Sequence, residues 1–276
     1  MDTSLVKTYK STVVAKQYKT GAIMKKSFLN AKEPFITEMI QVPTIELAET
    51  KIKNAVKDGA TAIGLQLGHL EKQFHTEETL NKLFALTGDM PLYITNYRGK
   101  FNQGLSDEQL MDGLLVALKC GATLVDVMGD TFNPSPEELT TDKTAIKKQM
   151  EFIDKVHKLG GEVLMSSHVK EFRSPERVLE IALEQQRRGA DIVKIVTGAN
   201  TQQEEVINLD ICRLLKQELK VPFLFLSGGQ YSYLHRTVGP ALGVCMWLCF
   251  RERDQYTYDG PPLLSDVLKL KQGLKL

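Results

Sequence analysis

The sequence predicts an α/β fold, a single (β/α)8 (TIM) barrel, and three observations lead to it. The chain has 276 residues, close to the roughly 250 that such a barrel usually takes. Eight short apolar runs recur along it, most of them separated by stretches with helical periodicity. The phrases DGATAIG, KCGATLV and RRGADIV repeat one pattern, a helix end and a glycine followed by an apolar run. Such alternation predicts a parallel sheet with right-handed crossovers, and eight units allow the sheet to close.

The eight apolar runs are the expected strands. They span residues 35–42, 62–68, 91–97, 123–129, 162–168, 192–198, 222–229 and 243–250. The clearest expected helices span residues 45–59, 107–121 and 175–189. The first ends in Gly59, a typical C-cap, and the third begins with Pro175 at the first helical position. No G-x-G-x-x-G follows any run, which removes the main argument for an open dinucleotide-binding sheet.

The chain is expected to form one domain. Residues 31–276 would be the catalytic barrel, and residues 1–30 an N-terminal extension packed on it. Within that extension, residues 11–26 are predicted to form a hairpin that closes the bottom of the barrel.

Composition and charge exclude several classes of function. With 35 basic and 34 acidic residues the net charge is +1, and no basic face would follow a phosphate backbone. The start of the chain lacks the apolar segment of a signal peptide, and no apolar stretch approaches the roughly 18 residues of a membrane span. The four cysteines show no zinc-binding spacing. We expect a cytoplasmic protein that binds neither nucleic acid nor membrane and uses no metal or cofactor.

Lys194 is the most informative single residue, because it lies inside an apolar run. Strand alternation places it on the same face as Ile192 and Val196. Burial without a partner disfavours the ammonium form and favours the neutral amine, which attacks carbonyl groups. The alternative is a lysine that reaches past the strand end to solvent or to a carboxylate.

His168 ends the apolar run that precedes the one with Lys194. If the two strands are neighbours, its imidazole lies over the same cavity and supplies a general acid–base near neutral pH. A histidine at a strand end is otherwise structural or a metal ligand. The remaining histidines are expected in loops or on helix surfaces, in contact with solvent; they are His69, His75, His157 and His235.

Two stretches in the second half of the chain resemble the type I 3-dehydroquinate dehydratases, a family of Schiff-base-forming barrels. LMSSHVKEFRSPE, residues 164–176, is similar to the family's strand-five signature. GADIVKIVTGAN, residues 189–200, is similar to its segment Gly-Ala-Asp-hydrophobic-Val-Lys. The resemblance covers roughly residues 35–270. It implies that Lys194 forms the imine and that His168 moves the proton.

The resemblance also indicates residues that bind the substrate. SGGQYSYLHR, residues 227–236, is similar to the family's late Ser-x-Gly...Arg segment, which implies that Arg236 binds the substrate carboxylate. Arg98 corresponds to the arginine after strand three. A guanidinium binds a carboxylate through two parallel hydrogen bonds, although from the residues alone either arginine could equally lie on the surface.

Several charged groups of the family are absent from this chain. Where the family has Glu-x-Arg-x-Asp after strand two, residues 64–68 read GLQLG and place Gln66 at the arginine position. Asn102 is the nearest match to the glutamate that follows the strand-three arginine, and the closing loop reads YDGPP without its serine and glutamine. Gln66, Asn102 and Gln230 are the neutral residues expected to contact the substrate.

The expected function is a Schiff-base lyase that removes water from 3-dehydroquinate or a related hydroxylated cyclic ketone or keto acid. The substrate is expected to be a small anion, and the family resemblance favours a homodimer. Three alternatives remain open. One is a class I aldolase acting on a hydroxylated keto acid or sugar, and another is a non-catalytic barrel that binds a metabolite. The third is a metal-dependent isomerase with Glu38, Asp126 and His168 as ligands.

Overall fold

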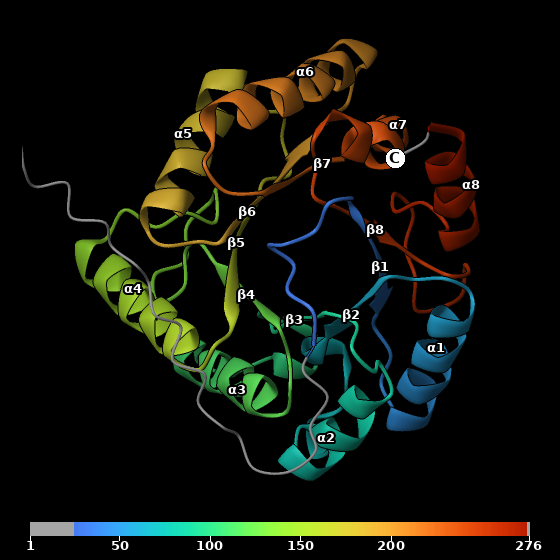
Figure 1. The fold of residues 1–276 in the computed structure, drawn as a ribbon. Coiled ribbons are helices and arrows are strands. Elements are labelled where there is room, and N and C mark those ends of the chain that lie inside the picture. Colours follow the sequence, from blue (N-terminus) through green and yellow to red (C-terminus); the bar gives the residue numbers. More distant parts are fainter. Residues whose placement is uncertain (1–24, 275–276) are drawn as a thin grey trace, which may run out of the picture.

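The computed structural model describes residues 25–274, which form a nearly closed barrel of eight parallel strands surrounded by eight α-helices (Figure 1). The strands are β1 (Phe35–Ile40), β2 (Ala62–Gln66), β3 (Leu92–Thr95), β4 (Leu124–Met128), β5 (Glu162–His168), β6 (Ile192–Gly198), β7 (Phe223–Gly228) and β8 (Met246–Cys249). The helices are α1 (Ile45–Lys57), α2 (Glu77–Ala85), α3 (Asp107–Lys119), α4 (Lys143–Lys158), α5 (Pro175–Arg187), α6 (Gln202–Glu218), α7 (Ser232–Val238) and α8 (Leu264–Leu274). Short 3-10 helices span Leu67–His69, Lys72–Phe74, Lys100–Asn102 and Gly239–Leu242.

Strand pairing is parallel throughout and follows the order of the chain. The hydrogen-bonded order is β7-β6-β5-β4-β3-β2-β1-β8. A backbone hydrogen bond from Cys245 N to Phe223 O (2.9 Å) joins the two remaining edges. β5 and β6 are neighbours, with Ser166 opposite Lys194. The predicted fold class is therefore confirmed, and so is the adjacency of the strands that carry His168 and Lys194.

The strands are shorter than the apolar runs at several ends. The run 243–250 becomes β8 only from Met246, because Gly243 adopts a left-handed backbone conformation (φ 114°) that ends the preceding 3-10 helix. The glycines of the three repeated phrases have φ values of 98°, 101° and 100°. Each follows the C-cap residue of a helix, where a residue without Cβ adopts this conformation at little cost.

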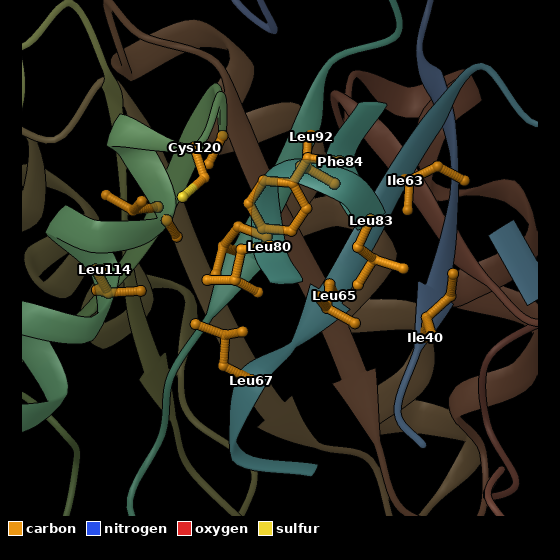
Figure 2. Packing of buried hydrophobic residues seen from close by; sticks show 14 of the residues in the cluster. Ile40, Ile63, Leu65, Leu67, Leu80, Leu83, Phe84, Leu92, Leu114 and Cys120 are labelled. Carbon is orange, nitrogen blue, oxygen red and sulfur yellow. The ribbon is translucent and has the colours of Figure 1, made fainter. Parts of the chain in front are cut away.

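Strand alternation divides the apolar side chains between two layers. Ile63 and Leu65 of β2 face outward and pack in one cluster with Leu80, Leu83 and Phe84 of α2 (Figure 2). Each large side chain buried in this way stabilises the fold by roughly 1.5–3 kcal/mol. Because the outward residues hold the strands against the helices, the residues between them point into the barrel.

The segment before β1 covers the amino-terminal end of the barrel. Phe28 is 2% exposed, and its ring packs edge-on against Phe35 with centroids 4.9 Å apart. Its backbone N–H donates to Glu162 Oε2 (3.0 Å) at the start of β5. The predicted hairpin, residues 11–26, lies almost wholly outside the described residues. No helix within residues 25–274 has the length and apolar character to cross a membrane.

Candidate active site

The carboxyl ends of the strands surround a cavity of about 430 Å³. This is the end of a (β/α)8 barrel at which reactive groups gather. The side chains that line the cavity from the strands and the residues just beyond them include Gln41, Gln66, Thr95, Tyr97, His168 and Lys194. The cavity therefore contains both residues for which the sequence predicts chemistry.

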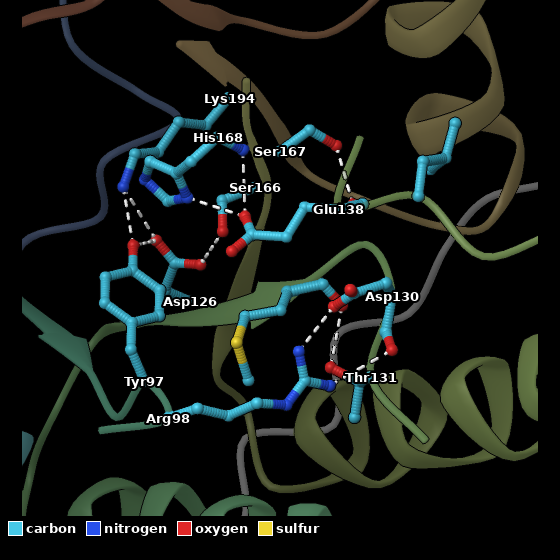
Figure 3. A network of polar contacts seen from close by, with 12 residues as sticks. Tyr97, Arg98, Asp126, Asp130, Thr131, Glu138, Ser166, Ser167, His168 and Lys194 are labelled. Atoms are coloured by element: carbon cyan, nitrogen blue, oxygen red, sulfur yellow. Dashed lines mark hydrogen bonds and ion pairs between the residues drawn. The ribbon is translucent and has the colours of Figure 1, made fainter. Parts of the chain in front are cut away.

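Lys194 points into the barrel and is 4% exposed. Its Nζ donates to Asp126 Oδ2 (3.1 Å) and to Tyr97 Oη (2.6 Å) (Figure 3). It also donates to Tyr93 Oη (3.1 Å). Asp126 lies on β4 and faces inward like the lysine. The lysine is therefore paired with a buried carboxylate. A carboxylate partner was one of the alternatives that the sequence left open for this lysine, and the sequence did not indicate that Asp126 supplies it.

Asp126 is the centre of a buried polar cluster. Its other oxygen, Oδ1, accepts a hydrogen bond from Ser166 Oγ (2.5 Å), while Tyr93 and Tyr97 donate to Oδ2. Burial alone raises the pKa of Asp126, but the charges of Lys194 and His168 and these hydroxyl bonds outweigh it and lower the pKa. Burial and the neighbouring carboxylate raise the pKa of Tyr97 well above its usual value. Asp126 is thus ionised and the tyrosine hydroxyls are protonated near neutral pH.

His168 is held by a residue from a different loop. Glu138, between β4 and α4, accepts hydrogen bonds through Oε2 from both His168 N (2.8 Å) and His168 Nδ1 (2.6 Å). Because Nδ1 carries the proton in this bond, Nε2 of the neutral ring is free to accept one. The ring of Tyr97 meets the imidazole edge-on, with centroids 5.2 Å apart. His168 therefore has a defined orientation and tautomer beside Lys194.

Contacts of Glu138 and of the preceding Glu137 hold their loop against the rest of the barrel. Glu138 has φ 47°, a conformation that non-glycine residues seldom adopt. Its carbonyl accepts from Ser167 Oγ (2.9 Å), and a Cβ at Gly129 would lie 2.5 Å from the same oxygen. The preceding Glu137 turns away and binds Arg173 Nε (2.7 Å) and Arg177 Nη2 (2.6 Å). Tertiary contacts thus hold a strained backbone in place.

We compared the chain that forms this barrel with known protein families and structures. The family model described as type I 3-dehydroquinase matches residues 38–251, more than half of the chain. The chain belongs to the type I 3-dehydroquinase family.

Individual relatives are distant from this member of the family. A curated 3-dehydroquinate dehydratase from Alkaliphilus oremlandii is 32% identical over 108 residues, which are 38% of this chain and 41% of that protein. The 3-dehydroquinate dehydratase structure from Geobacillus kaustophilus has a TM-score of 0.76 at 14% identity, covering 90% of this chain and 93% of that one. The type I enzyme from Clostridium difficile has a TM-score of 0.75 at 16% identity, covering 90% and 95%. At these identities the structures show the shared fold.

The two arginines that the family resemblance assigns to the substrate lie apart from Lys194. Arg98 forms a two-point ion pair with Asp107 (2.8 and 2.7 Å) and another bond with Asp130 Oδ1 (2.8 Å). Arg236 donates through Nε to Ser227 O (2.6 Å) and lines a neighbouring cavity. Neither guanidinium lines the Lys194 cavity, although Arg98 borders a smaller cavity of about 250 Å³ beside it.

Of the three neutral residues expected to contact the substrate, one lines the Lys194 cavity and two do not. Gln66 lines the Lys194 cavity. Asn102 is buried beside it and donates to Asn96 Oδ1 (2.8 Å) and Tyr97 O (2.8 Å), so its amide holds the segment after β3. Gln230 is exposed and borders the cavity of Arg236.

Glu38 does not share a site with Asp126 and His168. Its two neighbours on β1 point into the barrel, so the Glu38 side chain points towards the helices. It is 2% exposed and lies beside Cys249 of β8. Burial raises its pKa to about 7. Within residues 25–274 no group of three or more histidine, cysteine, aspartate or glutamate side chains could hold a metal ion. The set of ligands proposed for a metal-dependent isomerase is therefore not assembled.

Sequence reasoning missed Glu138 and the tyrosines that contact Lys194. Glu138 lies in a polar loop whose composition does not distinguish it from its neighbours. Tyr97 could have been predicted to face the cavity, since it lies two residues beyond the inward-facing Thr95 and continues the alternation of β3. Two histidines also differ from expectation: His69 lines the cavity, and His235 is 0% exposed. His235 is buried because α7 packs this face onto β7 and α6.

Proposed function

We propose that this chain is a Schiff-base hydro-lyase that removes water from a hydroxylated ketone. The observation that carries the proposal is that one cavity contains a buried lysine amine and a histidine whose Nε2 has no hydrogen-bond partner among the described residues. Membership of the type I 3-dehydroquinase family supports a dehydration. The family name designates 3-dehydroquinate as the reference substrate.

Lys194 supplies the nucleophile, and its neighbours determine how the amine loses its proton. The lowered pKa of Asp126 makes that carboxylate a poor proton acceptor. His168 lies on the strand adjacent to that of Lys194, and Glu138 orients its ring, so we assign it as the base. Proton transfer from Lys194 to His168 yields the neutral amine that attacks a carbonyl carbon. Asp126 then faces the nitrogen that becomes a positively charged iminium, which it stabilises.

The reaction proceeds through balanced steps. The amine adds to the ketone, and the resulting carbinolamine loses its oxygen as water to give the iminium. His168 removes a proton from the carbon next to the iminium, and the electron pair of that C–H bond forms an enamine. The enamine expels the β-hydroxyl, which leaves as water after taking a proton from His168. Addition of water to the conjugated iminium releases the unsaturated ketone and restores Lys194.

Borohydride trapping tests this proposal directly. The protein is mixed with 3-dehydroquinate and a panel of hydroxylated ketones, reduced, digested and mapped by mass spectrometry. We expect the adduct on Lys194, with a mass that shows loss of one further water when dehydration precedes reduction. Lys194→Met should abolish the adduct, whereas Lys147→Met, an equal change on the exposed face of α4, should not.

The same experiment separates the alternatives. An adduct that contains only a fragment of the ketone, with a released aldehyde, would identify a class I aldolase. No adduct with any ketone, while a known Schiff-base enzyme is labelled in parallel, would overturn the proposal and favour a metabolite-binding barrel.

A further inference from the structure

Two tyrosines contact Lys194, and they differ in their access to the cavity. Tyr93 is 0% exposed and is not among the residues that line the cavity, whereas Tyr97 is half-buried and lines it. The hydroxyl of Tyr97 lies 2.6 Å from Lys194 Nζ (Figure 3), and its ring meets His168 edge-on. A carbonyl group that reaches Lys194 Nζ therefore arrives beside the Tyr97 hydroxyl.

More donors converge on Asp126 Oδ2 than one oxygen accepts in good geometry. Tyr93, Tyr97 and Lys194 all donate to it, while a carboxylate oxygen offers about two lone pairs. The other oxygen, Oδ1, accepts separately from Ser166 Oγ. One of the three donors can therefore turn away without leaving the carboxylate unpaired. Of the two hydroxyls, that of Tyr97 has the space to do so, because its side chain borders the cavity.

Addition of an amine to a ketone places negative charge on the carbonyl oxygen, and a hydrogen-bond donor aimed at that oxygen stabilises the transition state. Asp126 is ionised and has no proton to donate. Tyr97 stays protonated, because burial and the neighbouring carboxylate raise the pKa of its phenol well above the usual value. The attacked oxygen lies next to the attacking nitrogen, which already contacts Tyr97 Oη. Tyr97 thus offers a donor where the charge develops.

We propose that Tyr97 is a catalytic residue, whose hydroxyl turns from Asp126 to the carbonyl oxygen of the ketone and donates a hydrogen bond to it as Lys194 adds. His168 carries two protons from Lys194 to that oxygen in succession. The first gives the carbinolamine hydroxyl, and the second gives the departing water and leaves the iminium. Tyr97 keeps its own proton throughout and returns to Asp126 when the water leaves. This inference rests on the proposed Schiff-base function, to which it adds a residue.

Tyr97→Phe and Tyr93→Phe form a matched pair of variants. Each removes one hydroxyl that contacts both Lys194 Nζ and Asp126 Oδ2. Their effects on the charges of the lysine and the carboxylate are therefore similar. Tyr97→Phe also removes a hydroxyl that borders the cavity, which Tyr93→Phe does not. A difference in rate between the two variants thus measures the contact with the ketone.

The rate of imine formation is measured by mixing each protein with 3-dehydroquinate, or with the ketone of the panel that labels Lys194 fastest. Borohydride quenches the reaction at successive times, and mass spectrometry follows the adduct across a range of pH. We expect Tyr97→Phe to lower the maximal rate about 100-fold. Tyr93→Phe should shift the pH of half-maximal rate and lower the maximum by less than about tenfold. Equal maximal rates in the two variants would overturn the proposal.

Two further measurements separate the hydroxyl from the fold. Thermal unfolding followed by circular dichroism should show that both variants are folded, because each leaves Asp126 with other donors. 3-Fluorotyrosine at position 97 keeps the ring and a more acidic hydroxyl, and it should give a maximal rate at least equal to that of the wild type. A rate as low as that of Tyr97→Phe would overturn the proposal, whatever the stability of the Phe variant.

The wild-type protein distinguishes failure of this proposal from failure of the Schiff-base function. If Lys194 is labelled in the wild type and the two Phe variants are equally slow, the imine chemistry stands and Tyr97 has only a structural role. If no ketone labels Lys194 in the wild type, while a known Schiff-base enzyme is labelled in parallel, both proposals fail.

Discussion

At the level of single residues, the orientation of His168 depends on one carboxylate from another loop. Glu138 binds both the backbone N–H and Nδ1 of His168 (2.8 and 2.6 Å). Such a partner selects the tautomer and restricts rotation of the ring. In place of the glutamate that follows the strand-three arginine in the family, this chain has Asn102, which holds backbone instead. The carboxylate that orients His168 comes from the loop between β4 and α4.

Substituting Glu138 should slow the chemistry without unfolding the protein. We expect Glu138→Ala to lower the rate of imine formation at Lys194 about 10- to 100-fold and to mix the two His168 tautomers in 15N NMR spectra. Glu138→Gln keeps an acceptor for Nδ1 and should recover part of the rate and the single tautomer. Glu137→Ala, the neighbouring change, should affect neither, since that side chain binds Arg173 and Arg177. A wild-type rate in Glu138→Ala would remove the positioning role.

At the level of elements, the loop between β4 and α4 brings Glu138 to β5. Arg188, at the end of α5 and 2% exposed, donates to Gly129 O (3.0 Å) and Thr140 O (2.6 Å), so it joins the two ends of the loop. Asp130, paired with Arg98, fixes the first turn of the loop. Arg98 thereby has a structural contact that the sequence does not reveal.

Gly129→Ala tests whether the loop must approach β4 closely. The added Cβ would meet Glu138 O at 2.5 Å, so the loop has to move. We expect a loss of roughly 1–3 kcal/mol in the free energy of unfolding and a lower rate of Lys194 labelling. Gly273→Ala adds the same methyl group to α8 with no atom within 4 Å. It should stabilise the fold by up to about 1 kcal/mol, and denaturant unfolding measures both. Equal stability of the two variants would show that the loop adapts without cost.

At the level of the whole molecule, the sheet separates two environments for carboxylates. Asp126 faces the interior and is compensated by Lys194 (3.1 Å). Glu38 faces the helices, where burial outweighs the bond from the Arg251 backbone and the charge of Lys51 and raises its pKa to about 7. A carboxyl whose pKa is higher in the folded state than in the unfolded state stabilises the fold only while it is protonated.

The stability of the barrel should therefore fall with pH through Glu38. Its contribution is complete below the unfolded pKa of 4.5 and is lost as pH rises through about 7. We expect Glu38→Gln to raise the free energy of unfolding at pH 8 by as much as roughly 3 kcal/mol, and by little at pH 4.5. Urea titrations of both proteins at the two pH values measure the difference. Glu78→Gln, on the exposed face of α2, should not reproduce the gain in stability at pH 8. A pH-independent difference would contradict the assignment to Glu38.

Much of the fold and half of the site could be predicted from local pattern. Strand alternation and helix capping depend on neighbouring residues, so the apolar runs and the repeated phrases that contain Gly59, Gly121 and Gly189 predicted the barrel. A lysine inside an apolar strand predicted an inward-facing amine, because the side-chain period of a strand is two. Whether the amine meets a carboxylate was left open by the sequence, and Asp126 reaches it from a different strand.

By itself the sequence determined the parallel barrel, the adjacency of the strands with His168 and Lys194, and the end of the barrel where they lie. Those properties follow from periodicity and from the order of units along the chain. The tertiary structure alone decided that Glu138 binds His168 and that Arg98 is held by Asp107 and Asp130. These depend on loop paths and on contacts between distant segments, where a displacement of one ångström makes or breaks a hydrogen bond.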